Sequence, residues 1–149
     1  MKTLFEDFTL SILKLNRLVQ KIKTHEIEKY GLKPVHAMCF YFLRKMPQEL
    51  TAKKLSDLCL EDKAAISRAL NLMQVKGYVR YDMNKRNAIV ELTDDGKQMA
   101  QVIYERIGNA VMAGSVDFTD TERVFFYKSL DAIVKNLTEY YGEIVKNND

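Results

Sequence analysis

The chain has 149 residues, of which 47% are hydrophobic and 29% charged, a composition typical of a globular protein and not of a disordered one. No apolar run approaches the roughly 20 residues that a membrane-spanning helix needs, and residues 1–20 mix charged with apolar side chains, unlike a signal peptide. We therefore expect a single cytoplasmic protomer with no membrane partner.

Cysteine and histidine are scarce. The chain contains Cys39, Cys59, His25 and His36, too few for a disulfide framework or a four-cysteine zinc site. The sequence contains no HExxH, GxSxG, CxxC or glycine-rich phosphate loop. We expect no catalytic residue, no metal and no cofactor, and therefore not an enzyme.

Charge is distributed unevenly along the chain. The net charge of +3 divides into +3 for residues 1–33, +4 for residues 34–92 and −4 for residues 93–149. A basic front and middle with an acidic end suits a protein that turns one side toward a polyanion such as nucleic acid. Ordinary surface variation is the alternative interpretation.

Apolar spacing predicts two helices before residue 50. Over residues 3–29 apolar side chains recur every three or four positions, which is the helical period. Gly31 ends this helix, and Pro34 opens the next at a position where proline is tolerated. The second helix extends from Val35 to Met46 and stops at Pro47.

The middle of the chain predicts a short helix pair followed by a hairpin. Thr51 is a suitable N-cap for residues 52–59, and Asp62 for residues 63–76, which end at Gly77. On the second of these helices Ile66, Ala69, Leu70 and Met73 share one apolar face. Strands are then expected at 78–81 and 88–92, joined by the polar turn 82–87. This order predicts a winged helix-turn-helix.

Two further helices are expected after the hairpin. Thr93 caps the first, which breaks at Gly114, and Thr119 with Glu122 forms a capping box for the second. The helices outside residues 34–96 have long apolar stripes that need a partner, and a two-fold homodimer supplies one. We expect a mostly α fold with a small β-hairpin wing: a helical dimerisation region at 1–33 and 97–149, and a winged helix-turn-helix DNA-binding lobe at 34–96.

The predicted DNA contacts fall into two groups. Phosphate contacts are expected from basic and hydroxyl side chains and from helix N-termini, whereas base edges are read by the exposed face of the 63–76 helix. An arginine at the wing tip can enter the minor groove. The phosphate set is Thr51, Lys53, Lys54 and Lys85, the recognition-helix set is Lys63, Ala64, Ala65, Ser67, Arg68 and Asn71, and the wing-tip residue is Arg86.

The segment Asp62–Arg80, with Ser67-Arg68 and Lys76-Gly77-Tyr78-Val79, resembles the recognition-helix signature of the MarR family. Leu92-Thr93-Asp94-Asp95-Gly96 is similar to the Leu-Thr-x-x-Gly that follows the wing in that family. The resemblance implies a bacterial transcription regulator. Two positions depart from the family pattern: Asn84 replaces an aspartate that orients the wing arginine, and Tyr81 replaces an arginine. Reading of the minor groove by Arg86 is therefore expected to differ.

The resemblance also implies a small aromatic or anionic effector. Arg17, His36 and Phe40 are candidates for its pocket, although a partly exposed histidine and a surface arginine are the simpler interpretation. Some relatives sense oxidants through cysteine, but Cys39 and Cys59 fall on apolar helical faces, where buried and inert cysteine is the default.

The leading functional hypothesis is a homodimeric repressor that binds a pseudo-palindromic site on double-stranded DNA and is released by an effector. The alternative is a winged-helix module that binds protein and not DNA. The basic wing and the exposed Arg68 favour DNA, because a protein-binding module has no need of a clustered basic edge.

Overall fold

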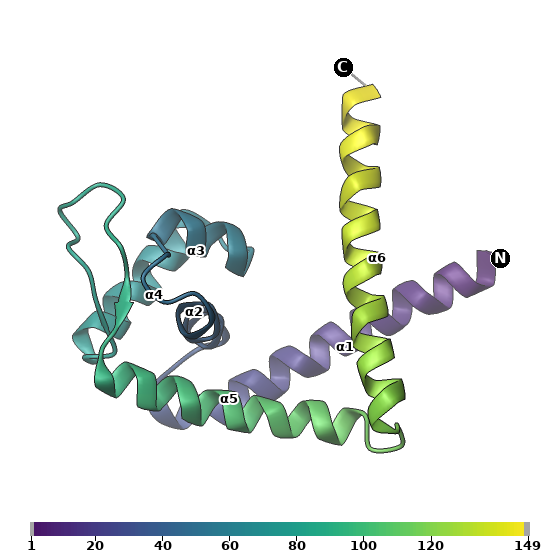
Figure 1. Ribbon diagram of the computed structural model, residues 1–149, viewed down its shortest axis with the longest axis horizontal. Helices are drawn as coiled ribbons and strands as arrows, with labels where there is room; N and C mark the ends of the chain where they lie inside the picture. The colour runs from purple at the N-terminus through teal and green to yellow at the C-terminus, as the bar shows by residue number, and fades with distance from the viewer. Residues whose placement is uncertain (1, 148–149) are drawn as a thin grey trace. The chain divides into compact units, whose positions relative to one another are not determined.

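The computed structural model describes residues 2–147, whose chain forms two compact units divided between Ala110 and Val111. Figure 1 shows the order of the elements. They are α1 (Lys2–Ile27), the 3-10 helix η1 (Glu28–Tyr30), α2 (Pro34–Lys45), α3 (Ala52–Cys59), α4 (Lys63–Val75), β1 (Val79–Arg80), β2 (Glu91–Leu92), α5 (Asp94–Gly114) and α6 (Asp120–Asn147). The mostly helical fold with one small hairpin is as predicted.

The predicted helix starts are confirmed by their side-chain caps. Thr51 Oγ1 accepts a hydrogen bond from the backbone N–H of Lys54 at 3.3 Å, and Asp62 Oδ1 accepts one from Ala65 at 2.7 Å. These bonds satisfy amides that a helix N-terminus leaves without an intrahelical partner. The predicted break after α4 is also present, since Gly77 has a φ of +77°.

The β-ladder is shorter than predicted. Only two residue pairs form it, Val79 with Leu92 and Arg80 with Glu91, whereas strands were expected over 78–81 and 88–92. The start of the returning segment pairs elsewhere, since Ile89 bridges Thr51 and the N–H of Val90 donates to the carbonyl of Leu50 at 2.8 Å. The backbone N–H and C=O groups of this segment are thus shared between β1 and the residues before α3.

The core of the first unit draws on every helix from α1 to α5 and on the wing base. The predicted apolar face of α4 is confirmed, because Ile66, Ala69, Leu70 and Met73 are all buried. The ring of Phe40 packs edge-on against Tyr78 with centroids 5.5 Å apart, which joins α2 to the wing. The largest fully buried side chains are Phe40, Ile27, Leu50, Leu55, Ile66, Leu70, Met73, Val90 and Cys39.

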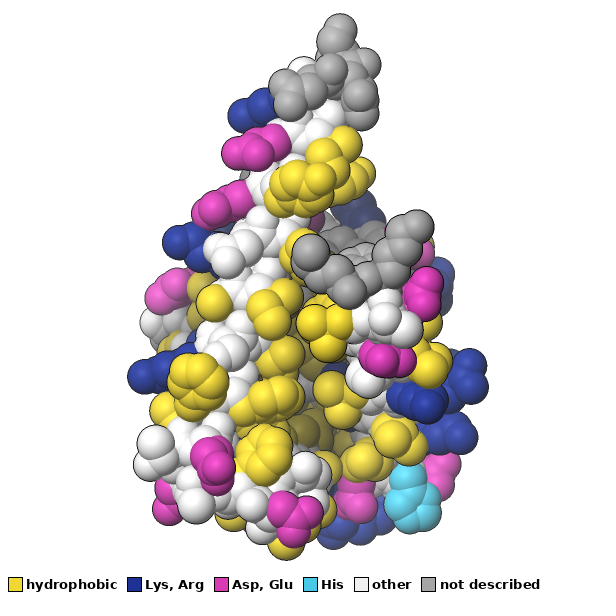
Figure 2. Space-filling model, turned by 90° about the vertical axis from the view of Figure 1, so that its right-hand side faces the viewer, with side chains coloured by type: hydrophobic (Ala, Val, Ile, Leu, Met, Phe, Trp, Pro, Cys, Tyr) yellow, Lys and Arg dark blue, Asp and Glu magenta, His cyan; other side chains and the backbone are white. Residues whose placement is uncertain are grey.

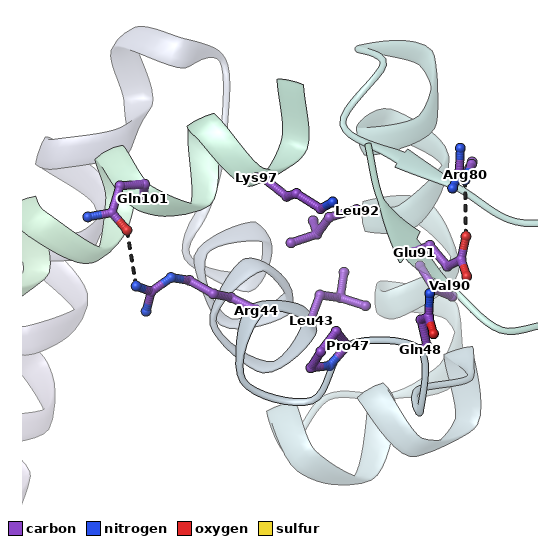
Figure 3. Close-up of a pocket in the computed structure, with 10 residues that line it drawn as sticks. All are labelled: Leu43, Arg44, Pro47, Gln48, Arg80, Val90, Glu91, Leu92, Lys97 and Gln101. Carbon is purple, nitrogen blue, oxygen red and sulfur yellow. Dashed lines mark hydrogen bonds and ion pairs between the residues drawn. The ribbon is translucent and has the colours of Figure 1, made fainter. Parts of the chain in front are cut away.

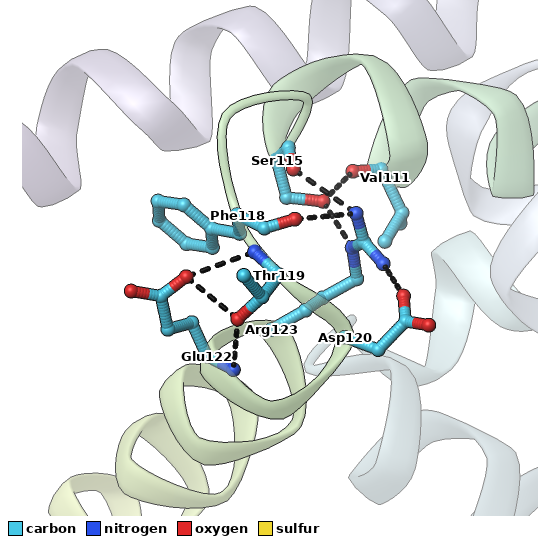
Figure 4. Close-up of polar contacts among 7 residues, drawn as sticks. All are labelled: Val111, Ser115, Phe118, Thr119, Asp120, Glu122 and Arg123. Atoms are coloured by element: carbon cyan, nitrogen blue, oxygen red, sulfur yellow. Dashed lines mark hydrogen bonds and ion pairs between the residues drawn. The ribbon is translucent and has the colours of Figure 1, made fainter.

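Arg123 organises the turn that leads into α6 (Figure 4). Its guanidinium donates to Ser115 Oγ at 2.8 Å and to the Ser115 carbonyl at 3.1 Å, and it pairs with Asp120 at 2.7 Å. The capping box predicted at the same place is confirmed: the N–H of Thr119 donates to Glu122 Oε2 at 2.8 Å, and Thr119 Oγ1 accepts the N–H of Glu122 at 3.3 Å. The start of α6 is therefore held by side chains.

Within residues 2–147, no helix combines the length and the hydropathy required to cross a bilayer. The predicted grouping of residues 1–33 with 97–149 concerns a dimer, and a single chain does not test it.

Candidate nucleic-acid interface

A groove lies between the recognition helix α4, the start of α3 and the wing. Seven of the predicted DNA-contacting residues line it together, although they come from three separate stretches of sequence. They are Thr51, Lys53, Lys63, Ser67, Asn71, Lys85 and Arg86. The fold thus places phosphate-binding and base-reading candidates on one surface.

The groove is strongly basic. Four cationic side chains line it, Lys53, Lys63, Lys85 and Arg86, against the single carboxylate of Asp82. Among the residues that the structure describes, none of these four cations is ion-paired. Unpaired cations around a concave surface create a positive potential that attracts a phosphate backbone.

The remaining predicted residues of α4 lie beside the groove. Ala64 and Arg68 are exposed on the helix, whereas Ala65 is half-buried and its N–H is held by Asp62. Arg68 is one turn from Ala64, so both share the solvent face of α4. Small residues next to one arginine allow this face to approach base edges closely.

Lys54, a predicted phosphate contact, is exposed at the start of α3 and does not line the groove. Its Nζ donates to the backbone carbonyl of Glu49 at 3.1 Å, and its backbone N–H is bound by Thr51. The ammonium group has three N–H donors, so two of them stay available for a phosphate contact.

The wing turn is shaped by its own side chains. Asp82 Oδ1 accepts the backbone N–H of Asn84 at 3.0 Å, and Asn87 adopts a φ of +55°, a left-handed conformation that asparagine tolerates. In the described residues neither Asp82 nor Asn84 pairs with Arg86. Arg86 thus lacks the carboxylate support expected from the family pattern.

Several groove residues were not predicted from the sequence. Tyr81, Met83 and Asn84 line the groove through the wing, and Ala52 and Ser56 line it through α3. The wing residues flank Lys85 and Arg86, so proximity in sequence was the available signal. Ala52 likewise lies between the predicted Thr51 and Lys53, whereas Ser56 had no such signal, because the packing of α3 beside α4 brings it to the groove.

The candidate effector residues Arg17, His36 and Phe40 are not brought together. Arg17 is exposed on α1 beside a shallow depression that includes neither of the others. Phe40 is fully buried in the core, and His36 is only 3% exposed. The simpler interpretation of His36 as partly exposed is also wrong.

His36 has a structural role at the start of α2. Its Nδ1 accepts the backbone N–H of Lys33 at 2.8 Å, so the side chain caps its own helix. Burial lowers the pKa of His36, and the positive charges of Lys33 and Lys76 lower it further. The folded state therefore favours the neutral form of the His36 imidazole, whose Nδ1 can accept this hydrogen bond.

Both cysteines are buried, as predicted. A hydrogen bond between the two thiols and burial raise the pKa of Cys39, while the same hydrogen bond lowers the pKa of Cys59. The thiols of α2 and α3 are thus neighbours, which the sequence did not indicate. Among the described residues no group of His, Cys, Asp or Glu side chains could hold a metal ion.

Comparison with known proteins agrees with this geometry. Solved structures with the same fold include a MarR transcriptional regulator from Methanosarcina mazei Go1, with 24% identity, a TM-score of 0.81, and coverage of 90% of this chain and 96% of that one. A MarR protein from Peptoclostridium difficile DA00132 has 20% identity, a TM-score of 0.78, and coverage of 93% and 92%. A putative MarR family regulator from Listeria monocytogenes, complexed with 26mer DNA, has 18% identity, a TM-score of 0.78, and 93% coverage of each chain. No curated protein sequence matches the chain significantly.

The fold and the groove define a winged helix-turn-helix protein. Residues 30–86, which include α2 to α4 and most of the wing, match the family model of the MarR family. The resemblance to the MarR family is therefore confirmed, and the chain has the fold of the MarR transcriptional regulators.

Proposed function

We propose that this protein is a sequence-specific DNA-binding transcriptional repressor that binds a pseudo-palindromic operator as a homodimer. In this proposal α4 enters the major groove, where Arg68 pairs with guanine and Asn71 with adenine. Lys53, Lys63 and Lys85 contact phosphates, and Arg86 approaches the minor groove.

The observation that carries the proposal is the basic groove beside α4. Four unpaired cations and one carboxylate surround it, and exposed polar side chains of the helix face the same side. Such a surface fits a duplex, whose phosphates need cations and whose base edges need short hydrogen-bonding side chains. The Listeria monocytogenes regulator of similar fold is complexed with DNA, which supports the same role here.

Homodimer formation is supported by apolar side chains that the single chain leaves exposed. On α6 they include Phe125 at 72%, Val134 at 65% and Leu137 at 53%, and on α1 they include Leu4 at 72% and Leu13 at 61% exposure. Figure 2 shows apolar side chains along the open faces of these helices. Stripes of this kind mark an interface, because isolated helices do not expose them stably in water.

We further propose that a small-molecule effector releases the repressor by altering the separation of the two recognition helices. A dimer reads two half-sites about one helical turn apart, so a small change in that separation weakens binding to both.

Selection from random duplex DNA followed by sequencing tests the proposal. We expect enrichment of a short inverted repeat. We expect R68A to bind it at least about tenfold more weakly, because one base contact contributes roughly 1–3 kcal/mol of discrimination. Affinity should also fall steeply as salt rises from about 50 to 200 mM.

The matched control is K128A, which removes a positive charge from an exposed position of α6 outside the groove. It should retain wild-type affinity. If the folded wild-type protein enriches no sequence at low salt, or if R68A binds the selected site as tightly as wild type, the proposed role of α4 is wrong.

A further inference from the structure

A second cavity, of about 470 Å³, lies on the winged-helix unit apart from the basic groove (Figure 3). It is bounded by the end of α2 and the loop that follows, by both wing strands and by the first turns of α5. Its lining includes Leu43, Arg44, Arg80, Glu91, Leu92 and Lys97. It shares none of them with the groove. Its volume is within the range of small-molecule sites.

Three cations, Arg44, Arg80 and Lys97, line the cavity together with one carboxylate, that of Glu91. Two of the cations therefore have no carboxylate partner within the cavity. Arg80 is neutralised, because its Nε lies 3.0 Å from Glu91 Oε2 across the β-ladder. Among the described residues Arg44 contacts only neutral groups, donating to Gln101 Oε1 at 3.0 Å and lying 4.1 Å from the centre of the Tyr104 ring. Lys97 has one weak, exposed partner outside the cavity, Asp94 at 3.8 Å. The cavity therefore has a net surplus of two positive charges.

The two surplus cations come from different elements. Arg44 lies at the end of α2 and Lys97 in the first turns of α5; in Figure 3 the guanidinium of Arg44 points toward Gln101 and the ammonium of Lys97 toward Leu92. Leu92 is half-buried and provides apolar surface in the same cavity, whereas Leu43 and Val90 line it but are almost wholly buried. A ligand that complements the two cations and the apolar surface has one anionic group for each cation and a hydrocarbon body between these groups.

We propose that this cavity binds a small dicarboxylate. One carboxylate pairs with the guanidinium of Arg44, whose planar donors suit bidentate binding, and the other with the ammonium of Lys97. The hydrocarbon body covers Leu92. Glu91 does not repel the ligand strongly, because its ion pair with Arg80 neutralises its negative charge.

Occupation of the cavity is coupled to the wing. Arg80 and Glu91 are register partners at the base of the hairpin that carries Lys85 and Arg86. Both residues also line the cavity, so a bound ligand lies against the ion pair at the base of the hairpin. Regulation of DNA binding through this contact rests on the proposed function, whereas ligand binding itself does not.

The test measures binding without DNA. Adipate is titrated calorimetrically into the full-length protein at low salt, with hexanoate as the monoanion of equal chain length. We expect adipate to bind at least about tenfold more tightly than hexanoate, since a second charge-assisted hydrogen bond is made. Methyl resonances of Leu43 and Leu92 should shift with adipate.

Substitutions locate the site. We expect R44Q and K97Q each to weaken adipate binding about tenfold, and K128Q, on α6, to leave it unchanged. K97Q alone keeps the test decisive if R44Q fails to fold, because Lys97 makes only an exposed surface pair. The proposal is overturned if adipate does not bind, if hexanoate binds equally well, or if K97Q binds adipate like wild type.

Failure of this proposal and failure of the DNA proposal are distinguishable. Loss of operator binding in R68A with unchanged adipate affinity separates the two sites. If the protein binds adipate but selects no DNA sequence, the proposed ligand site is supported and the proposed repressor function is refuted.

Discussion

The backbone carbonyl of Tyr78 lies directly against the Cα atom of Gly96, so a Cβ atom on residue 96 would overlap the carbonyl oxygen. The Cδ2 atom of Leu92 lies 3.2 Å from the position that this Cβ atom would take. This contact packs the start of α5 onto the wing base, and it explains why glycine ends the Leu92–Gly96 motif.

Replacement of Gly96 by alanine should destabilise the protein. The Cβ meets backbone atoms, which cannot rotate away, so we expect G96A to lower the free energy of unfolding by about 3 kcal/mol. Urea denaturation measures the change. In the same helix Gly108 has open space around its Cβ position, so G108A should be neutral or stabilise by up to about 1 kcal/mol. Equal stability of G96A and wild type would refute the packing described.

A charge among the exposed apolar side chains of α6 should prevent formation of the proposed dimer. Val134 is 65% exposed in the single chain, and in a dimer V134E would bury an unpaired carboxylate. We expect the dimer dissociation constant to rise about a hundredfold or more, measured by analytical ultracentrifugation. N136E adds the same charge to an exposed polar position of α6 and should remain dimeric. A dimeric V134E would show that this face is not the interface.

Protonation of His36 should destabilise the fold in mild acid. Burial lowers its pKa below the unfolded value of 6.5, so below that pH the unfolded chain binds more protons than the folded one. His36 therefore contributes stability that is present above pH 6.5 and is lost as pH falls toward the folded pKa. The slope for one such group is at most about 1.4 kcal/mol per pH unit.

Denaturant titrations between about pH 5 and pH 8 check this. H36N keeps an oxygen that can accept the Lys33 N–H but does not titrate, so its stability should depend less on pH than that of wild type. An H36N profile parallel to wild type would rule out His36 as the group responsible.

The two cysteines should react slowly with alkylating reagents and in a defined order. Cys39 is fully buried and its pKa is raised by the hydrogen bond to Cys59 and by burial, whereas Cys59 is 9% exposed and its pKa is lowered by that bond. Because the thiolate is the reactive form, we expect Cys59 to be modified before Cys39, and both far more slowly than in urea. Iodoacetamide labelling followed by peptide mass spectrometry measures both rates. Rapid labelling of Cys39 in the native protein would contradict its burial.

Local features were predictable from the sequence because short-range physics decides them. The caps at Thr51, Asp62 and Thr119 bond to amides three residues away, and the apolar face of α4 follows from the helical period. Seven of the residues that line the basic groove were also predictable, since α4 and the wing are continuous stretches whose exposed sides follow once the buried side is known.

Only the tertiary structure decided contacts between segments distant in sequence. It paired Val90 with Leu50 and thereby shortened the wing ladder, and it placed Arg44 and Lys97 around one cavity. It also buried His36 and Phe40, which pattern reasoning had assigned to a cleft. Periodicity shows which side of an element is apolar, but it does not show which other element covers that side. That choice depends on the packing of the whole unit, in which side chains from five helices and the wing must fill one core.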